Sequence, residues 1–357
     1  MALAFAGTAP FGADILRGLL DGAGEHAGRE VALVISQPDR PAGRGQKVSS
    51  SAVTRLARER GLRLEQPERT HSDDMLARYA ELGIDTIIVA AFGQMIREPL
   101  LSDYLLLNVH GSLLPAYRGA APVERSIIDG CDETGVDIMQ MEAGLDTGPV
   151  AFEGRVPITL EDDAGMIFTK IADVGAELLH RALDAAAAGT LTFTPQPKAG
   201  ATYAHKIVAA DRYLNFAVSS RALHDRVRGL SPHIGAFTWV GEERLGLWRT
   251  TIIDEAATAS VVDETAENAA DATGGDRKHS TIDNLARAVW QQPGVVSHTA
   301  KQLVIGTLDG AVEVLELQPA GKRRMNASDW LRGLREPLAT NVTPPRPLPP
   351  TPPTEGS

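Results

Sequence analysis

The amino-acid sequence predicts an α/β fold, in which a mostly parallel sheet forms the first half of the chain and a small β-barrel forms the second. Its 357 residues exceed what one hydrophobic core usually serves, so we expect two domains. Apolar runs alternate with amphipathic helical patterns up to residue 190, as they do in parallel sheets covered by helices. Beyond residue 210 the runs are short and separated by turns, which is typical of small barrels.

Five apolar runs in the first half are candidates for sheet strands. Most of their positions are apolar, rather than every second one, which is typical of strands buried on both faces. In chain order the runs are LAFAG (3–7), EVALVIS (30–36), DTIIVAA (85–91), YLLLNVH (104–110) and GVDIMQM (135–141). Helical patterns lie between them at 51–61 and 73–83, and a longer pattern at 163–189 closes the domain. We therefore assign residues 1–190 to the first domain.

The second half is divided by segments that carry no periodic pattern. Proline and glycine residues make 191–210 a linker, and the barrel domain follows over 211–335. Its expected elements are a short helix near 220–229 and the runs GAFTWV, RLGLWRTTIID, QLVIGTL and AVEVLELQ, the last two joined by an Asp-Gly turn. A composition rich in Ala, Asp, Thr and Gly predicts a disordered insertion over about 255–290. Repeated prolines make 336–357 a tail.

The composition is that of an ordinary globular protein. Hydrophobic residues make up 43% and charged residues 23%, and no apolar run reaches the ~18 residues that a membrane helix needs. Cys131 is the single cysteine and the N-terminus lacks a basic signal region, so we expect a cytoplasmic protein. The net charge is −11, but seven acidic residues lie between Asp254 and Asp276. The rest of the chain therefore carries only −4, which leaves room for local basic surfaces. No long apolar stripe is left over for an interface, which favours a monomer.

Asn108 and His110 end the apolar run LLLNVH. Because residues two apart in a strand face the same side, both side chains project together at the carboxyl end of the strand, the edge where open α/β sheets bind ligands. An amide and an imidazole there could polarise a carbonyl and stabilise a developing oxyanion. Capping of the strand end by hydrogen bonds to the backbone explains the spacing alone equally well.

Asp146 follows the next run, in EAGLDTG, between Gly144 and Gly148. The two glycines permit a tight backbone path close to a ligand. A carboxylate near His110 would orient the imidazole, so that Asn108, His110 and Asp146 form an acid–base and oxyanion-stabilising set. Taken alone, Asp146 has the simpler explanation of an aspartate that caps a turn.

Two further loops could bind ligands. In AAFGQMI, Phe92 could present an aromatic surface and the backbone beside it could recognise a heterocycle, although Phe-Gly is also common turn chemistry. In SQPDRPAGRGQK, Arg40, Arg44 and Lys47 lie in a Pro- and Gly-rich loop and are suited to phosphates. A solvated surface loop is the commoner reason for such a composition.

These segments together resemble the methionyl-tRNA formyltransferase family. The matching motifs are, in family order, FAGTAPFGADIL, SQPDRPAGRGQK, NVHGSLLPAYRGAAPVERSI, GVDIMQMEAGLDTGPV and LQPAGKRRMNASDW. NVHGSLLPAYRGAAP followed by GLDTG is the most specific part of the resemblance. Three features depart from the family pattern. Ala9-Pro10 stands where the family usually has Pro-Asp, a histidine stands at His205, and the acidic insertion is added. They bear on tRNA affinity more than on the chemistry.

The resemblance implies a Rossmann-like formyltransferase domain followed by an oligonucleotide-binding-like barrel. It implies transfer of the formyl group of 10-formyltetrahydrofolate to the α-amine of initiator methionyl-tRNA, with no metal. Asn108, His110 and Asp146 fall on the family's catalytic triad. The implied folate-binding residues are Phe92, Gly93, Gln94, Met95, Ser112, Leu113, Leu114, Pro115 and Gly144. The basic loop 36–51 and the barrel are implied to hold the acceptor end of the tRNA.

Three other functions compete with this one. The same triad and folate could serve a formyltransferase of another amine, such as a sugar nucleotide or glycinamide ribonucleotide, but the basic loop and the long second domain favour tRNA. A non-catalytic RNA-binding protein would not need Asn, His and Asp together. A dinucleotide-dependent oxidoreductase would need the glycine fingerprint, which AGTAPFG lacks, and no Cys/His cluster has metal-ligand spacing.

Overall fold

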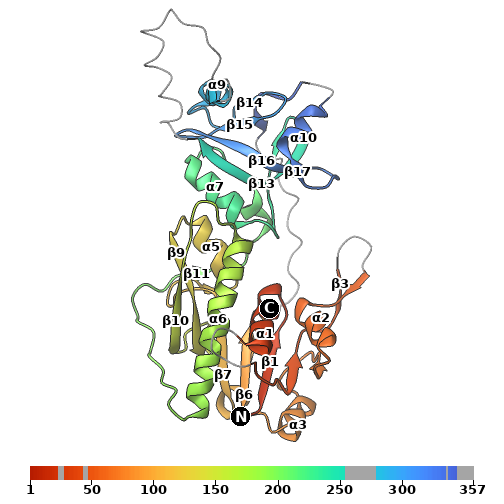
Figure 1. The fold of residues 1–357 in the computed structure, drawn as a ribbon, viewed down its shortest axis with the longest axis vertical. Helices are drawn as coiled ribbons and strands as arrows, with labels where there is room; N and C mark the ends of the chain where they lie inside the picture. Colours follow the sequence, from red (N-terminus) through yellow and green to blue (C-terminus); the bar gives the residue numbers. More distant parts are fainter. Residues whose placement is uncertain (23–27, 43–46, 254–278, 335–336, 344–357) are drawn as a thin grey trace, which may run out of the picture. The chain divides into compact units, whose positions relative to one another are not determined.

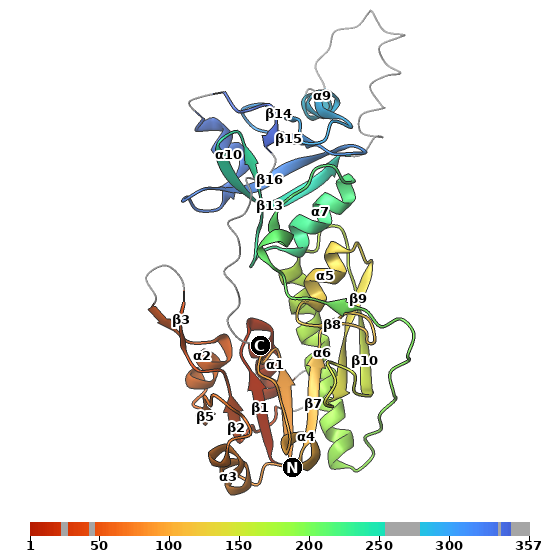
Figure 2. The ribbon, with the colours of Figure 1, turned by 180° about the vertical axis from the view of Figure 1, so that it is seen from behind.

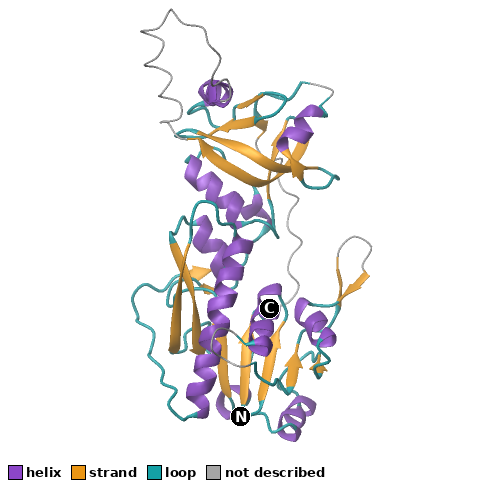
Figure 3. Ribbon diagram, in the orientation of Figure 1, coloured by secondary structure: helices purple, strands orange, loops and turns teal. Residues whose placement is uncertain are grey.

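The computed structural model describes residues 1–22, 28–42, 47–253, 279–334 and 337–343. Within them the chain divides into two compact units. Unit 1 contains residues 1–126, 131–159 and 166–206, and unit 2 contains 127–130, 160–165 and the described residues from 207 onward. Figure 1 and, from behind, Figure 2 show the elements of each unit, and Figure 3 distinguishes helix from strand.

A seven-stranded sheet forms the centre of unit 1. Its strands are β1 (Leu3–Gly7), β2 (Leu33–Ile35), β5 (Leu64–Glu65), β6 (Thr86–Ala90), β7 (Leu105–His110), β9 (Glu133–Gln140) and β10 (Val150–Pro157). The order across the sheet is β10-β9-β7-β6-β1-β2-β5. All five runs that we predicted as strands form strands. The sequence did not reveal β5, which is two residues long, or β10, an edge strand whose side chains are mostly outside the core.

The strands of this sheet do not all pair in the same direction. β5, β2, β1, β6 and β7 are parallel, which confirms the mostly parallel sheet, whereas β9 runs antiparallel to both β7 and β10. Gln140, the last residue of β9, therefore lies opposite Leu107, and Asp137 lies opposite His110. The loop after β9 starts three residues short of the end of β7, roughly 10 Å from His110 along the strand.

Helices cover both faces of the sheet. α1 (Pro10–Asp21) and α6 (Ala164–Ala187) pack so closely that a Cβ at Gly18 would lie 2.5 Å from that of Ala176. On the opposite face, α3 (Asp73–Glu81) buries Met75 and Tyr79 in the core with β1, β2 and β6. The shorter elements are α2 (Ala52–Glu59), α4 (Leu100–Asp103), α5 (Pro122–Ile128), β3 (Arg40–Ala42), β4 (Lys47–Ser49), β8 (Arg118–Gly119) and β11 (Tyr203–Ala204).

One strand of this sheet carries a buried carboxylate. Asp137 is fully buried in β9, with His110 opposite it on β7 and Glu153 opposite it on β10. The Leu114 N–H donates to Asp137 Oδ2 at 2.7 Å, while Oδ1 is buried with no hydrogen-bond partner among the described residues. Burial raises the pKa of Asp137 to about 7, although the hydrogen bond from Leu114 opposes this shift.

Unit 2 is an antiparallel sheet with helices packed on it, which confirms the small barrel-like second domain. Its strands are β12 (Ala236–Val240), β13 (Glu243–Ile253), β14 (Val296–His298), β15 (Leu303–Gly306), β16 (Ala311–Pro319), β17 (Met325–Asn326) and β18 (Val342–Thr343). Its helices are η1 (Ala209–Arg212), α7 (Ser220–Gly229), α9 (His279–Val289) and α10 (Ala327–Arg332). The strand order is β14-β15-β16-β13-β12-β18, and β17 pairs with β16. The two ends of this path are joined, because Val296 N–H donates to Thr340 O and Val342 N–H to Gly294 O, both at 2.8 Å.

Two segments of unit 2 differ from the sequence prediction. Residues 337–343, which we assigned to the start of the tail, contain β18, whose two residues pair with β12. Within the insertion predicted over about 255–290, residues 279–289 form α9, which buries Leu285 and Val289, one helical turn apart, against β15 and β16. The rest of the predicted insertion up to 278, and the tail from 344, lie outside the described residues.

α7 contains a buried ion pair. Arg228 Nε donates to Asp225 Oδ1 at 2.7 Å, and Arg221 Nε donates to Asp225 Oδ2 at 2.6 Å. Arg228 also donates to the backbone oxygen of Asp162 at 2.8 Å. Asp225 and Arg228 are both nearly inaccessible. These bonds pair the buried charges of Asp225 and Arg228 and attach the segment that precedes α6 to α7.

We expect Asp225→Ala to destabilise unit 2 by about 3–5 kcal/mol, because the buried Arg228 would lose the carboxylate that binds its Nε atom. Asp329→Ala is the matched control, since Asp329 pairs with Arg332 at the same spacing on an exposed helix surface, where such pairs contribute less than about 1 kcal/mol. All four tryptophans lie in unit 2, so urea unfolding followed by tryptophan fluorescence measures both variants. Equal losses in the two variants would contradict the prediction.

We expect Asp137→Asn to change the pH dependence of unit 1 stability. The wild-type carboxyl binds its proton more tightly in the folded state, so the stability it contributes is full below its ordinary pKa and is lost as the pH rises through about 7. Asparagine does not titrate in this range. The difference in free energy of unfolding between variant and wild type should therefore grow in favour of the variant by about 1.4 kcal/mol per pH unit between about pH 4 and 7. Calorimetry across this range measures it, and a difference independent of pH would contradict it.

Candidate active site

Asn108 and His110 lie where the sequence predicts, at the carboxyl end of β7. Asn108 is half-buried and His110 is buried. His110 Nε2 is 3.0 Å from the backbone oxygen of Tyr117. Because a carbonyl oxygen can only accept, this contact assigns a proton to Nε2 and leaves Nδ1 as the nitrogen that faces the site. The bond to Tyr117 thus orients the imidazole.

Asp146 approaches the imidazole from the loop between β9 and β10. Its Oδ2 atom is 3.8 Å from His110 Nδ1, a distance longer than a hydrogen bond but suited to a charge interaction. The Gly119 N–H donates to the same oxygen at 2.8 Å, which fixes the carboxylate. Because β9 is antiparallel to β7, the end of β9 does not lie beside His110, and the loop after β9 brings Asp146 back along the sheet.

Gln196 holds this loop, and sequence reasoning missed it. Its Nε2 donates to the backbone oxygens of Asp146, at 2.8 Å, and of Gly148, at 2.7 Å. Its Oε1 accepts from Arg118, whose Nη2 atom is 2.5 Å away. The segment around it was predicted as a linker, but Thr194 bridges to Val150 and β11 pairs with β8 in unit 1. The only sequence signal was a polar residue between two prolines, which is too common to be diagnostic.

Three loops of the site contain a residue other than glycine with positive φ. They are Ala91 at 46°, Tyr117 at 57° and Asp146 at 50°. Sparsely populated backbone conformations of this kind cost about 1–3 kcal/mol each and concentrate at functional sites. Tyr117 presents its carbonyl to His110, and Ala91 presents its carbonyl to the N–H groups of Thr8 and Ala9. The backbone is therefore constrained where the candidate site lies.

The segment Ser112–Pro115 follows β7 directly. The Ser112 hydroxyl is buried and donates to the backbone oxygen of Ala116 at 2.7 Å. The Leu114 side chain is buried, and its N–H is bound by Asp137. Leu113 and Pro115 are only partly buried. Ser112 and Leu114 therefore shape the segment, and their side chains are not exposed to a ligand.

The loop Phe92–Met95 differs from its sequence interpretation in one respect. The Phe92 ring lies in the core with α3 and is 2% exposed, so it does not present an aromatic surface, and that interpretation is wrong. Its ring packs instead with apolar side chains of β1, β2 and β6. Gly93 and Met95 are exposed and Gln94 is partly buried. Gly144, in the Asp146 loop, is also exposed, and a Cβ there would lie 2.2 Å from the Thr147 hydroxyl.

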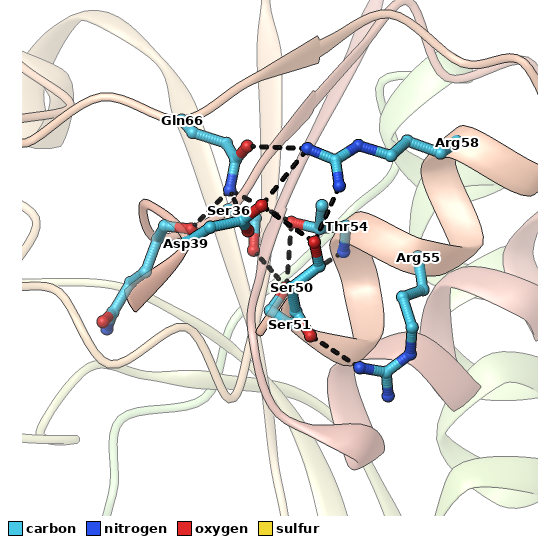
Figure 4. Close-up of polar contacts among 9 residues, drawn as sticks. Ser36, Asp39, Ser50, Ser51, Thr54, Arg55, Arg58 and Gln66 are labelled. Carbon is cyan, nitrogen blue, oxygen red and sulfur yellow. Dashed lines mark hydrogen bonds and ion pairs between the residues drawn. The ribbon is translucent and has the colours of Figure 1, made fainter. Parts of the chain in front are cut away.

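The basic loop forms a hairpin of β3 and β4. Arg40 is exposed, with Nη2 3.8 Å from Glu68 Oε2. Lys47 belongs to β4, but its side chain, like the whole of Arg44, lies outside the described part of the chain. Figure 4 shows the polar contacts at the root of this hairpin, among Asp39, Ser50 and their neighbours.

Other kinds of site receive no support in the described residues. No cluster of three or more His, Cys, Asp or Glu side chains there has an arrangement that could hold a metal ion. Among the helices described, none has the length and apolarity needed to cross a membrane. A groove of about 580 Å³ between α1 and α6 includes Asp14, Asp173 and Glu177 and none of the three candidate catalytic residues.

Chemically, the site combines three capacities. Asn108 offers an amide donor, His110 offers a nitrogen that can hold a proton, and Asp146 offers a fixed carboxylate beside it. Ser112, the serine nearest to His110 in the sequence, donates its hydroxyl to the backbone and is not aligned with the imidazole as a nucleophile. The arrangement suits addition of an external nucleophile to a carbonyl carbon, with stabilisation of the oxyanion and transfer of one proton.

Comparison with known proteins gives the same class of reaction. The family model described as formyl transferase matches residues 1–183, and that of the formyl transferase C-terminal domain matches 206–335. The methionyl-tRNA formyltransferase of Symbiobacterium thermophilum is 37% identical over 345 residues, which cover 96% of this chain and 95% of that protein. That of Synechococcus elongatus is 38% identical over 340 residues, covering 94% and 97%.

Solved structures share the fold at low sequence identity. WlaRD, a sugar 3N-formyl transferase solved with dTDP and 5-N-formyl-THF, has a TM-score of 0.58 at 15% identity, over 90% of this chain and 99% of that one. HypX from Aquifex aeolicus in complex with tetrahydrofolic acid has a TM-score of 0.56 at 16% identity, over 93% of this chain and 47% of that one. The matches to both formyl transferase domains, and relatives of 37% and 38% identity along nearly the whole chain, show that this chain belongs to the methionyl-tRNA formyltransferase family.

Proposed function

We propose that this protein transfers the formyl group of 10-formyltetrahydrofolate to the α-amine of initiator methionyl-tRNA, and that Asn108, His110 and Asp146 perform the transfer. The observation that carries the assignment of residues is the 3.8 Å approach of His110 Nδ1 to Asp146 Oδ2 beside the end of β7. The substrate is supported by the methionyl-tRNA formyltransferases to which the chain is similar over nearly its whole length.

The reaction develops negative charge on one oxygen. The free α-amine attacks the formyl carbon, and the carbonyl oxygen becomes anionic in a tetrahedral intermediate. The Asn108 carboxamide, which projects on the same side of β7 as His110, donates a hydrogen bond to this oxygen. The intermediate then releases tetrahydrofolate through cleavage of the bond between the formyl carbon and N10.

One proton moves in each turnover, from the attacking amine to the departing N10. His110 Nδ1 is suited to hold this proton, because Nε2 is engaged with Tyr117 O and keeps the ring in place. A proton on Nδ1 gives the ring a positive charge, which the Asp146 carboxylate stabilises from 3.8 Å away. The Gly119 N–H keeps the carboxylate in position while the charge changes.

The substrate contacts follow from what is exposed. Gly93, Met95 and Gly144, with the partly buried Gln94, Leu113 and Pro115, are proposed to contact the folate. Phe92, Ser112 and Leu114 would contribute backbone atoms, because their side chains are buried. The hairpin of Arg40, Arg44 and Lys47 is proposed to bind tRNA phosphates. We further propose that the protein acts as a monomer in the cytoplasm.

The competing acceptor is a different amine, since a sugar 3N-formyl transferase has a similar fold. The deciding experiment supplies 10-formyltetrahydrofolate and compares initiator methionyl-tRNA with an amino-sugar nucleotide as acceptors. We expect formylation of the methionyl-tRNA alone. Formylation of the sugar nucleotide with no product on the tRNA would overturn the proposed function.

We expect Asn108→Ala to lower kcat by ~10²–10³, the usual effect of losing one group that stabilises an oxyanion, and His110→Ala to lower it by ~10²–10⁴, the usual contribution of a group that transfers the proton. Asp146→Asn should also lower kcat while keeping an oxygen for the Gly119 N–H, so that the loop keeps its form. Binding of methionyl-tRNA should be unchanged within about twofold in all three variants. A parallel loss of tRNA affinity would contradict the assignment.

We expect Arg40→Ala and Arg44→Ala to weaken tRNA binding and to flatten its salt dependence, because each cation that contacts a phosphate contributes close to one unit to the slope of log K against log salt. Glu68→Gln is the control and should strengthen tRNA binding, since it removes an anion 3.8 Å from Arg40. Filter binding at several salt concentrations measures all three variants. An unchanged slope in the arginine variants would exclude the hairpin from the phosphate contacts.

A further inference from the structure

The basic hairpin is fixed at its root by one carboxylate. Asp39 precedes β3 and Ser50 follows β4, and the Ser50 hydroxyl donates to Asp39 Oδ2 at 2.8 Å. Arg58 on α2 binds both residues, with Nη1 2.7 Å from the Ser50 hydroxyl and Nη2 3.3 Å from Asp39 Oδ2. Both strands of the hairpin therefore leave the body of unit 1 from a single polar cluster, which Figure 4 shows.

Gln66, which follows β5, occupies the centre of this cluster. Its Nε2 donates to Asp39 Oδ1 at 2.8 Å and to the backbone oxygen of Gln37 at 2.9 Å. Its Oε1 is 3.4 Å from Arg58 Nη2. The hydrogen bond from Gln66 is the largest cause of the lowered pKa of Asp39, so it favours the ionised carboxylate that the root requires. Gln66 thus binds two residues, Gln37 and Asp39, of the segment that leads from β2 into the hairpin.

The same segment contacts the loop proposed to bind the folate. Gln37 Nε2 donates to the backbone oxygen of Phe92 at 2.9 Å, and Gln94 Nε2 donates to the backbone oxygen of Pro67 at 3.0 Å. Gly93 permits this approach, because a Cβ there would lie 2.7 Å from Gln37 Nε2. The Phe92–Met95 loop is thus bonded to Gln37 and Pro67. Gln66 binds the backbone oxygen of Gln37 and directly precedes Pro67.

We propose that Gln66 is a positioning residue for both substrates, and this proposal rests on the function proposed above. Through Asp39 its carboxamide sets the direction of the tRNA-binding hairpin. Through Gln37 and Pro67 it sets the position of the Phe92–Met95 loop that contacts the folate. One side chain then fixes the relative placement of the formyl donor loop and the acceptor hairpin within unit 1.

Three substitutions separate the two connections. Ser50→Ala removes a contact of the hairpin root only, and Gln37→Met removes the contact with Phe92 O only. Gln66→Met keeps the length of the side chain and removes its hydrogen bonds to Asp39 and Gln37 together. Initial rates of formyl transfer, with each substrate varied in turn, give kcat and both KM values for every variant.

Gln66→Met should raise the KM values for methionyl-tRNA and for 10-formyltetrahydrofolate, each by about three- to tenfold, the range of one or two lost hydrogen bonds. Ser50→Ala should raise only the KM for tRNA, and Gln37→Met only that for the folate. The value of kcat should stay within about twofold, because the triad is not touched. A purely structural role would instead lower the active fraction, and hence kcat, with both KM values unchanged.

A rise in only one KM for Gln66→Met, or in neither, would overturn the proposal. Failure of the wild-type protein to formylate methionyl-tRNA would instead count against the proposed function. In that case, folate binding measured by calorimetry still tests the connection through Gln37, because it needs no acceptor. Equal folate affinity in the wild type and in Gln66→Met would then overturn the proposal independently.

Discussion

The antiparallel pairing of β9 with β7 is the constraint on which the site depends. It places Asp137, rather than the end of β9, opposite His110, so a carboxylate that is to reach the imidazole must return along the sheet on a loop. That loop needs glycines, a residue with positive φ at Asp146, and the side chain of Gln196 to hold its carbonyls. Asn108 and His110 are held by β7, and hydrogen bonds between loops bring Asp146 to them.

The sequence predicts the parts of this protein that depend on local patterns. Apolar runs located five strands of the first sheet, and the motif around His110 placed Asn108 and His110 at the end of a strand, because strand periodicity and strand ends are properties of short segments. The direction of β9, the role of Gln196 and the burial of Phe92 could not be predicted in this way. Each depends on which distant segment becomes the neighbour, and a polar or aromatic residue in a loop gives no sign of that partner.

The two units differ in the hydrogen-bond partners that they give to a buried carboxylate. Asp225 in unit 2 receives two arginines and remains an ion in the interior. Asp137 in unit 1 receives a single N–H, from Leu114, and burial therefore favours its neutral form. That N–H belongs to the segment after His110, so the buried carboxyl is bonded to the backbone beside the candidate site.

The residues just before the proline-rich end of the chain complete unit 2. β18 pairs with Trp239 and Val240 of β12, while Thr340 O accepts from the Val296 N–H of β14 and the Val342 N–H donates to Gly294 O. Without these residues, both outer strands of the sheet would expose unpaired N–H and C=O groups, which are templates for edge-to-edge association between molecules. A protein shortened at residue 336 would therefore tend to aggregate, whereas one ending at Thr343 would retain its covered edges.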